Sequence, residues 1–73
     1  MPGTYMHKIE YLVLDTKLEG GAWRPWYLDG VEIPGWTALR FVPYLKSLGE
    51  RGWDLSVFRA LPETETFVFK RTP

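Results

Sequence analysis

Few side chains in this sequence are of types that do chemistry, and their spacing forms no catalytic pattern. His7 is the single histidine of the chain, so an imidazole base or metal ligand would have to be this residue. Ser47 and Ser56 lack the Gly-x-Ser-x-Gly context of an activated nucleophile. Glu63 and Glu65 fall around an expected solvent-exposed turn, which would not give them separate acid and base roles. We therefore expect no catalytic residue, no metal site and no bound cofactor.

Two further patterns can be interpreted as binding features. Gly20-Gly21 lacks the glycine spacing and following lysine of a phosphate-binding loop, and we interpret it as a flexible connector. Trp23, Trp26 and Trp36 are expected near loops, where they could form an exposed aromatic surface that stacks on a sugar or a base. They could instead close the ends of a shallow core. The second role is favoured, because buried aromatic rings are the main stabilising resource of so small a domain.

Composition limits the class of protein. A chain of 73 residues allows one domain, 1–73, with a thin core, and the lack of cysteine excludes disulfides and thiolate metal sites. Lys+Arg and Asp+Glu number 9 each, so no net charge attracts duplex nucleic acid or an anionic membrane. No apolar run has a membrane-spanning length, and residues 1–4, expected to be disordered, do not resemble a signal peptide. We expect a cytoplasmic protein without membrane contact.

The first half of the chain is expected to form strands. Residues 5–14 alternate in polarity like a strand, except that Leu12 and Leu14 interrupt the polar face. Residues 15–22 are expected to be a loop. Asp29-Gly30 between two apolar runs predicts a hairpin over residues 25–34, bracketed by Pro25 and Pro34.

One helix and two more strands are expected in the second half. Apolar residues recur at helical spacing from residue 39 to 48, with a start either near Thr37 as N-cap or at Pro43. Gly49 or Gly52 would end the helix. Residues 53–59 alternate with Trp53, Leu55 and Val57 inward, and residues 65–71 alternate with Phe67 and Phe69 on one face. The order β, β-hairpin, α, β, β predicts an α+β fold: a small antiparallel sheet of four or five strands with one helix on one face.

The segment Tyr44-Leu45-Lys46-Ser47-Leu48-Gly49-Glu50-Arg51-Gly52-Trp53-Asp54-Leu55 resembles the signature of a family of small bacterial proteins, the domain-of-unknown-function 4177 family. Ile9 to Leu14 and Phe69-Lys70-Arg71 extend the resemblance across nearly the whole chain. Ile9, Asp54, Arg51 and Pro43 depart from the family's usual pattern. The resemblance implies the fold and no activity. From the residues themselves we expect a structural signature, with helix docking, a turn and a core tryptophan, in Leu45, Leu48, Gly49, Gly52, Trp53 and Leu55.

A single helix covers one side of such a sheet, and an apolar surplus should remain on the other. We expect Leu12, Leu14, Phe58 and Val68 to point to the uncovered side and to form an interface. The favoured hypothesis is a non-enzymatic binding or scaffolding domain that forms a homo-oligomer, or binds another protein, through this face or an edge strand.

Two alternatives stay open. Sheet aromatics could stack the bases of a single-stranded nucleic acid while basic side chains contact its phosphates; the basic residues in question are Arg24, Arg59, Lys70 and Arg71. The balanced charge disfavours this. A weaker alternative is an enzyme whose active site is built at a subunit interface, which would require converging polar groups there.

Overall fold

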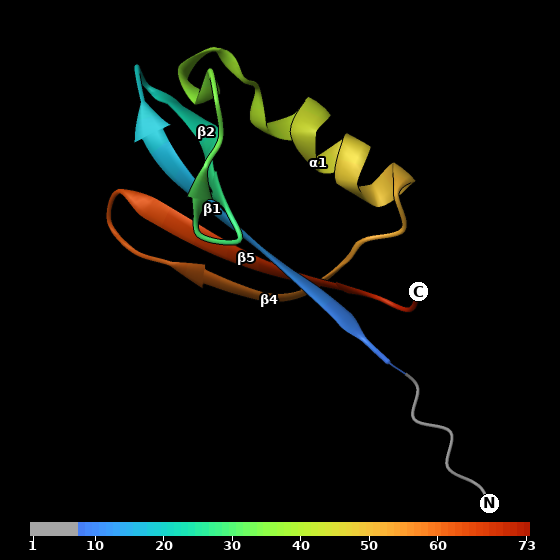
Figure 1. Cartoon of the computed structure of the whole chain (residues 1–73). Helices are drawn as coiled ribbons and strands as arrows, with labels where there is room; N and C mark the ends of the chain where they lie inside the picture. Colours follow the sequence, from blue (N-terminus) through green and yellow to red (C-terminus); the bar gives the residue numbers. More distant parts are fainter. Residues whose placement is uncertain (1–7) are drawn as a thin grey trace, which may run out of the picture.

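The computed structural model describes residues 8–73 as an antiparallel sheet with one α-helix lying across one face (Figure 1). The elements are β1 (Glu10–Glu19), β2 (Ala22–Leu28), β3 (Val31–Glu32), a 3-10 helix η1 (Trp36–Ala38), α1 (Phe41–Glu50), β4 (Asp54–Ala60) and β5 (Thr64–Arg71). The five strands lie in the order β3-β2-β1-β5-β4, so β3 and β4 form the edges. The α+β fold predicted from the sequence is confirmed.

The first hairpin is longer than predicted. β1 does not end at Leu14 but continues to Glu19, and Gly20-Gly21 joins it to β2 in a two-residue turn. Both glycines have positive φ, 60° and 77°, a conformation that glycine adopts without steric cost. The expected loop over residues 15–22 was therefore wrong, because this glycine pair is a tight turn rather than a flexible connector. The expectations for residues 1–4 and for the start of the first strand, His7 included, lie outside the described residues.

The hairpin around Asp29-Gly30 is confirmed. Asp29 and Gly30 have φ values of 50° and 80°, and they join β2 to the two-residue strand β3. Asp29 is also bound to β1, because its Oδ1 accepts the Val13 amide at 2.9 Å and its own amide donates to the Val13 carbonyl at 2.8 Å. Pro25 does not bracket this hairpin. It lies inside β2, beside a bulge in the pairing with β1, where a missing N–H is tolerated.

The helix starts between the two predicted positions. Thr37 lies within η1 rather than acting as an N-cap, and α1 begins at Phe41 after the extended residue Arg40. Pro43 thereby falls in the first turn, where a backbone N–H has no partner within the helix, so its ring costs little. Gly52, with a φ of 89°, redirects the chain after the helix. No helix within residues 8–73 has the length and hydrophobicity needed to cross a membrane.

The core lies between α1 and the central strands. Leu14, Leu48, Phe67 and Phe69 form it, and Leu12 is packed against it. In the β1–β5 ladder Leu12 lies opposite Phe69 and Leu14 opposite Phe67, so both leucines point toward the helix. The expectation that Leu12 and Leu14 face the uncovered side was therefore wrong. They belong to the buried face of β1, and Val13, which lies between them, belongs to the opposite face.

β4 and β5 pair with an irregularity that changes the predicted pattern. Phe67 and Phe69 share the helix face as predicted, and Leu55 and Phe58 lie opposite Phe69 and Phe67 respectively. The register shifts between Leu55 and Val57, leaving Ser56 as an extra residue. Val57 therefore lies on the face opposite α1, beside Val68. The predicted inward direction of Val57 was wrong, because strict alternation takes no account of a bulge.

Candidate functional site

The residues of chemically active types do not come together. Ser47 lies on α1 and donates its hydroxyl to the Tyr44 carbonyl at 2.9 Å, whereas Ser56 is exposed at the bulge of β4. Glu63 is exposed beyond the end of β4, and Glu65 accepts the Thr16 hydroxyl at 3.2 Å. Among residues 8–73, no three His, Cys, Asp or Glu side chains are arranged to hold a metal ion. This part of the chain shows no nucleophile paired with a base.

Two of the three tryptophans that were expected near loops pack against each other. The rings of Trp26 and Trp36 have centroids 6.1 Å apart, and Lys17 places its Nζ 4.8 Å from the Trp26 ring. Trp23 lies farther along β2, opposite Leu18. All three tryptophans are half-buried rather than exposed. Their packing joins η1 to β2, as expected of rings that close one end of a thin core.

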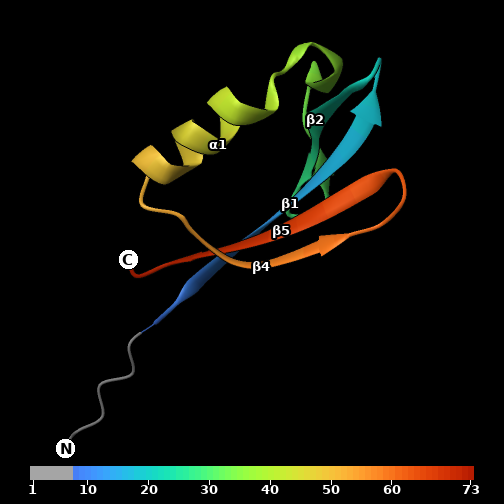
Figure 2. The ribbon, with the colours of Figure 1, turned by 180° about the vertical axis from the view of Figure 1, so that it is seen from behind.

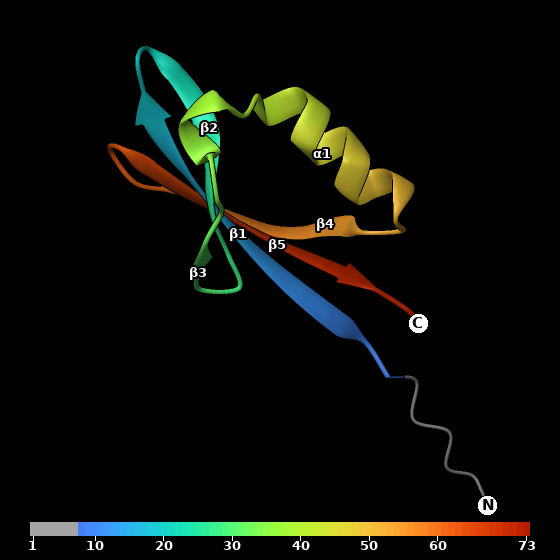
Figure 3. The same ribbon diagram turned by 45° about the horizontal axis from the view of Figure 1, so that its top comes forward.

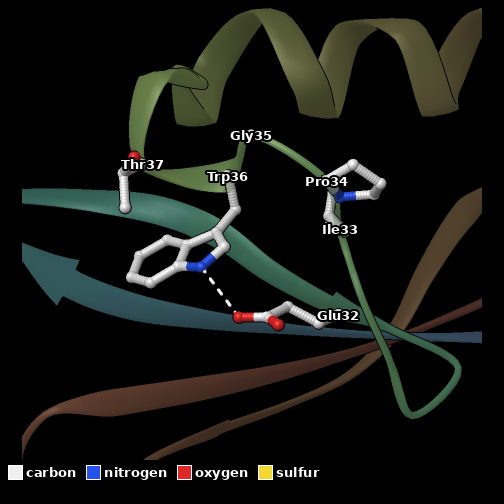
Figure 4. Close-up of a pocket in the computed structure, with 6 residues that line it drawn as sticks. All are labelled: Glu32, Ile33, Pro34, Gly35, Trp36 and Thr37. Carbon is white, nitrogen blue, oxygen red and sulfur yellow. Dashed lines mark hydrogen bonds between the residues drawn. The ribbon is translucent and has the colours of Figure 1, made fainter.

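A shallow hollow adjoins this aromatic pair. It has a volume of about 420 Å³ and is lined by the segment from Glu32 to Thr37. Figure 4 shows the Trp36 indole and the Glu32 carboxylate within it, joined by a hydrogen bond of 3.1 Å from Nε1 to Oε2. The hollow thus offers one carboxylate that is already bonded and one ring edge. It has no pair of groups that could transfer a proton.

A second hollow lies between β3 and the helix. It has a volume of about 220 Å³ and is mostly apolar, with Tyr44 of α1 facing Leu28, Val31 and Ile33. Burial raises the pKa of the Tyr44 hydroxyl above its ordinary value, while the positive charge of Arg51 acts in the opposite direction. The raised pKa reflects desolvation at the packed side of the helix. It does not create a base that works near neutral pH.

Most of the residues expected to bind a nucleic acid make contacts within the fold instead. Phe67 and Phe69 are buried beneath α1, so they present no ring for stacking. Arg24 donates to the Leu39 carbonyl at 2.9 Å. Arg71 is held by Glu10 at 2.7 Å and lies 4.1 Å from the Trp53 ring centroid. The other two basic residues of that hypothesis, Arg59 and Lys70, are exposed on the face opposite α1.

The structural signature surrounds the end of the helix. Leu48 is buried in the core, Leu45 packs against it, and Gly52 makes the turn at which its positive φ is required. Arg71 donates to the Arg51 carbonyl at 2.9 Å while lying over Trp53. These contacts fix where β4 begins. Unlike Leu45, Leu48 and Trp53, Leu55 exposes more than half of its surface.

Exposed apolar residues are concentrated along β4. All seven residues of this strand are exposed, although it is paired to β5 along its inner side. Leu55 and Val57 each expose 54% of their surface and Phe58 exposes 50%, with Leu61 equally exposed just beyond the strand. In Figures 1 and 2, β4 is the outermost strand on the lower side, away from α1. In the tilted view of Figure 3, β4 is drawn between α1 and β5, and β3 lies at the other edge of the sheet. The candidate site is therefore this edge, which we call the β4 edge (residues 54–60).

The predicted interface residues are divided between core and surface. Phe58 lies on the β4 edge with its ring centroid 5.0 Å from that of Phe67, on the helix face, so the prediction that it faces the uncovered side was wrong. Val68 is half-buried and does lie on the face opposite α1. Leu12 and Leu14 are core residues, as described above. Leu55 and Val57 were predicted to point inward and are surface residues instead. The signal was present in Leu55-Ser56-Val57-Phe58, where three apolar residues in four positions do not fit a simple two-faced strand.

Comparisons with known proteins supply no relative. No family model, no curated protein and no solved structure matches this chain.

Proposed function

We propose that this chain is a non-enzymatic protein-binding domain that uses the β4 edge to pair with a strand of another polypeptide. The observation that carries the proposal is a seven-residue edge strand whose every residue is exposed. An edge strand presents unpaired backbone N–H and C=O groups along its outer side, which an incoming strand can satisfy. Exposed side chains on both faces of β4 would add apolar contacts to those backbone hydrogen bonds.

The composition of β4 supports this role. Proteins usually protect an edge strand with proline, charged side chains (lysine above all), a β-bulge or very short length, and of these β4 has the bulge at Ser56 and a charge near each end. β4 has the sequence Asp-Leu-Ser-Val-Phe-Arg-Ala and carries neither proline nor lysine. Its charges stand at Asp54 and Arg59, leaving the centre of the strand uncharged. When a partner covers apolar surface that the monomer leaves in water, the complex is stabilised by roughly 25 cal/mol per Å² of surface buried.

Kinship with the domain-of-unknown-function 4177 family is part of the proposal and rests on the segment 44–55. This segment includes most of α1, the Gly52 turn and the start of β4. It therefore positions the edge and does not itself supply a ligand site. The kinship adds no activity to the proposal.

The experiment is a matched pair of valine substitutions followed by sedimentation velocity over a range of protein concentrations. Val57→Lys places a charge in the centre of the β4 edge, whereas Val42→Lys places one on the exposed side of α1, where the valine is 57% exposed against 54% at Val57. We expect wild type and Val42→Lys to associate and Val57→Lys to stay monomeric, because burying an unpaired ammonium group is costly. Association of Val57→Lys to the same extent as wild type and Val42→Lys would contradict the proposal.

A further inference from the structure

We infer that the strand accepted by the β4 edge is β4 of a second copy of this chain, antiparallel, with Asp54 of each copy opposite Arg59 of the other. This inference rests on the proposed function and adds to it the identity of the partner and the register. Its support is the pattern of charges and faces along β4. The pattern is complementary to itself when the strand is turned end for end.

The faces of the β4 residues follow from their pairing with β5. Leu55 and Phe58 lie opposite Phe69 and Phe67, so both are on the helix face. Asp54 and Arg59 lie opposite Lys70 and Thr66, so both are on the face opposite α1. In a regular strand, residues 55 and 58 would point to opposite faces. The bulge at Ser56 brings both apolar side chains to the same face.

A two-fold axis between Ser56 and Val57 matches the pairs on either side of the bulge and leaves Ser56 opposite Val57 next to the axis. Asp54 then faces Arg59 of the second copy, and Leu55 faces its Phe58, with each pair occurring twice. Residues directly opposite each other in an antiparallel ladder share a face. The ion pairs therefore form on the face opposite α1 and the apolar pairs on the helix face, which is where each residue already points. Opposite charges and aromatic–aliphatic neighbours are both favourable cross-strand pairs.

Neighbouring registers lose this match. A shift of one residue sets Leu55 opposite Arg59, joining side chains that point to different faces. An axis through Phe58 keeps the faces but sets Val57 opposite Arg59, leaving both charges without a partner. The chosen register also uses charges that are otherwise unpaired. Within residues 8–73 the ion pair of the fold joins Arg71 to Glu10, and neither Asp54 nor Arg59 takes part in one.

The resulting dimer would extend the sheet to ten strands, five from each copy. The axis is perpendicular to the sheet, so both copies of α1 lie on the same face. The interface is confined to one strand from each copy, and a strand contact of this size is typical of a weak, concentration-dependent dimer. Two like-charge contacts at such an interface are expected to weaken association by about tenfold or more.

A charge exchange tests the register. Asp54→Arg alone brings the introduced arginine against Arg59 of the second copy, and Arg59→Asp alone brings the introduced aspartate against Asp54 of the second copy. Because each like-charge contact occurs twice, either variant alone should be monomeric where wild type dimerises.

An equimolar mixture of the two variants should form a one-to-one heterodimer. In the mixed pair, positions 54 and 59 are both arginine on one strand and both aspartate on the other, so opposite charges meet at each end. The double variant Asp54→Arg/Arg59→Asp should dimerise like wild type. Glu50→Arg and Lys46→Asp, both exposed on α1, are the matched controls and should leave dimerisation unchanged.

The possible failures are distinguishable by sedimentation together with circular dichroism, which verifies that each variant is folded. A mixture that stays monomeric while Val57→Lys still blocks the wild-type dimer would overturn the register and leave the β4 edge as the interface. A wild-type chain that is monomeric throughout would overturn the second copy as partner. A dimer that Val57→Lys does not affect would overturn the proposed function along with this inference.

Discussion

The two edges of the sheet end in different ways. At one edge β3 has two residues, and the chain leaves it through Pro34 into η1, which packs against β2 through Trp36 and Trp26. At the other edge β4 has seven residues, no proline, and no element packed on its outer side within the described residues. Val31 at the first edge is at least as exposed as any apolar residue at the second. Side-chain exposure is thus common to both edges, and strand length together with proline separates a protected edge from one able to pair.

The largest expected effect is a difference in stability loss between substitutions at the centre of the sheet and substitutions at the β4 edge. Leu14→Ala should lower the free energy of unfolding by about 2–5 kcal/mol, because Leu14 is fully buried and its truncation removes apolar contacts and leaves a cavity in the core. Val57→Ala should lower the free energy of unfolding of the monomer by less than about 1 kcal/mol, since about half of Val57 is already exposed to water. Urea denaturation at low protein concentration measures both. Equal losses would mean that β4 is part of the core rather than a free edge.

The next prediction concerns the protected edge. Gly30 has a φ of 80°, so Gly30→Ala should cost about 1 kcal/mol and loosen the turn that attaches β3. Self-association should not change, because β3 lies at the opposite edge from β4. Thermal unfolding and sedimentation of the same sample test the two parts. A change in association would show that β3 contributes to the interface.

The smallest expected effect is a dependence of stability on alkaline pH at the β3 side of the helix. The pKa of Tyr44 is raised in the folded state by burial, so the unfolded chain loses this proton first. The contribution of Tyr44 to stability is therefore complete below its unfolded pKa, near 10, and is lost as pH rises through the higher folded value. Tyr44→Phe should flatten the fall in stability above about pH 10 in urea titrations. An unchanged slope would exclude Tyr44 as its source.

The features predicted from sequence are those that depend on near neighbours. Asp29-Gly30 identified its hairpin because both turn positions need positive φ, and the alternation of Phe67 and Phe69 identified the buried face of β5. Gly49 or Gly52 was expected to end the helix; Gly52 does so, and Gly49 lies within α1. Each of these depends on a few consecutive residues.

The features that were missed depend on pairing between distant segments. Leu12 and Leu14 form an apolar row whose direction is decided by the register of β1 against β5, the last strand of the chain. Val57 changed face because of a bulge that only the ladder with β5 defines. The position of β4 at an edge follows from the strand order, which local patterns do not encode. Phe58 was predicted as an interface residue, but on the opposite face of the sheet from the one it occupies, and Leu55, Val57 and the two charges that flank them were assigned to the β4 edge from the structure.

Amide hydrogen exchange as a function of protein concentration shows whether β4 pairs with a second strand. If β4 pairs with a second strand, the amides of residues 54–60 should exchange more slowly at about 500 µM than at about 5 µM, because the dimer fraction rises with concentration. Residues 22–32, which include β3, should exchange at the same rate in both samples. The additional protection from exchange at the higher concentration should be confined to β4. Equal exchange of residues 54–60 at both concentrations, or protection that appears at β3 instead, would contradict this prediction.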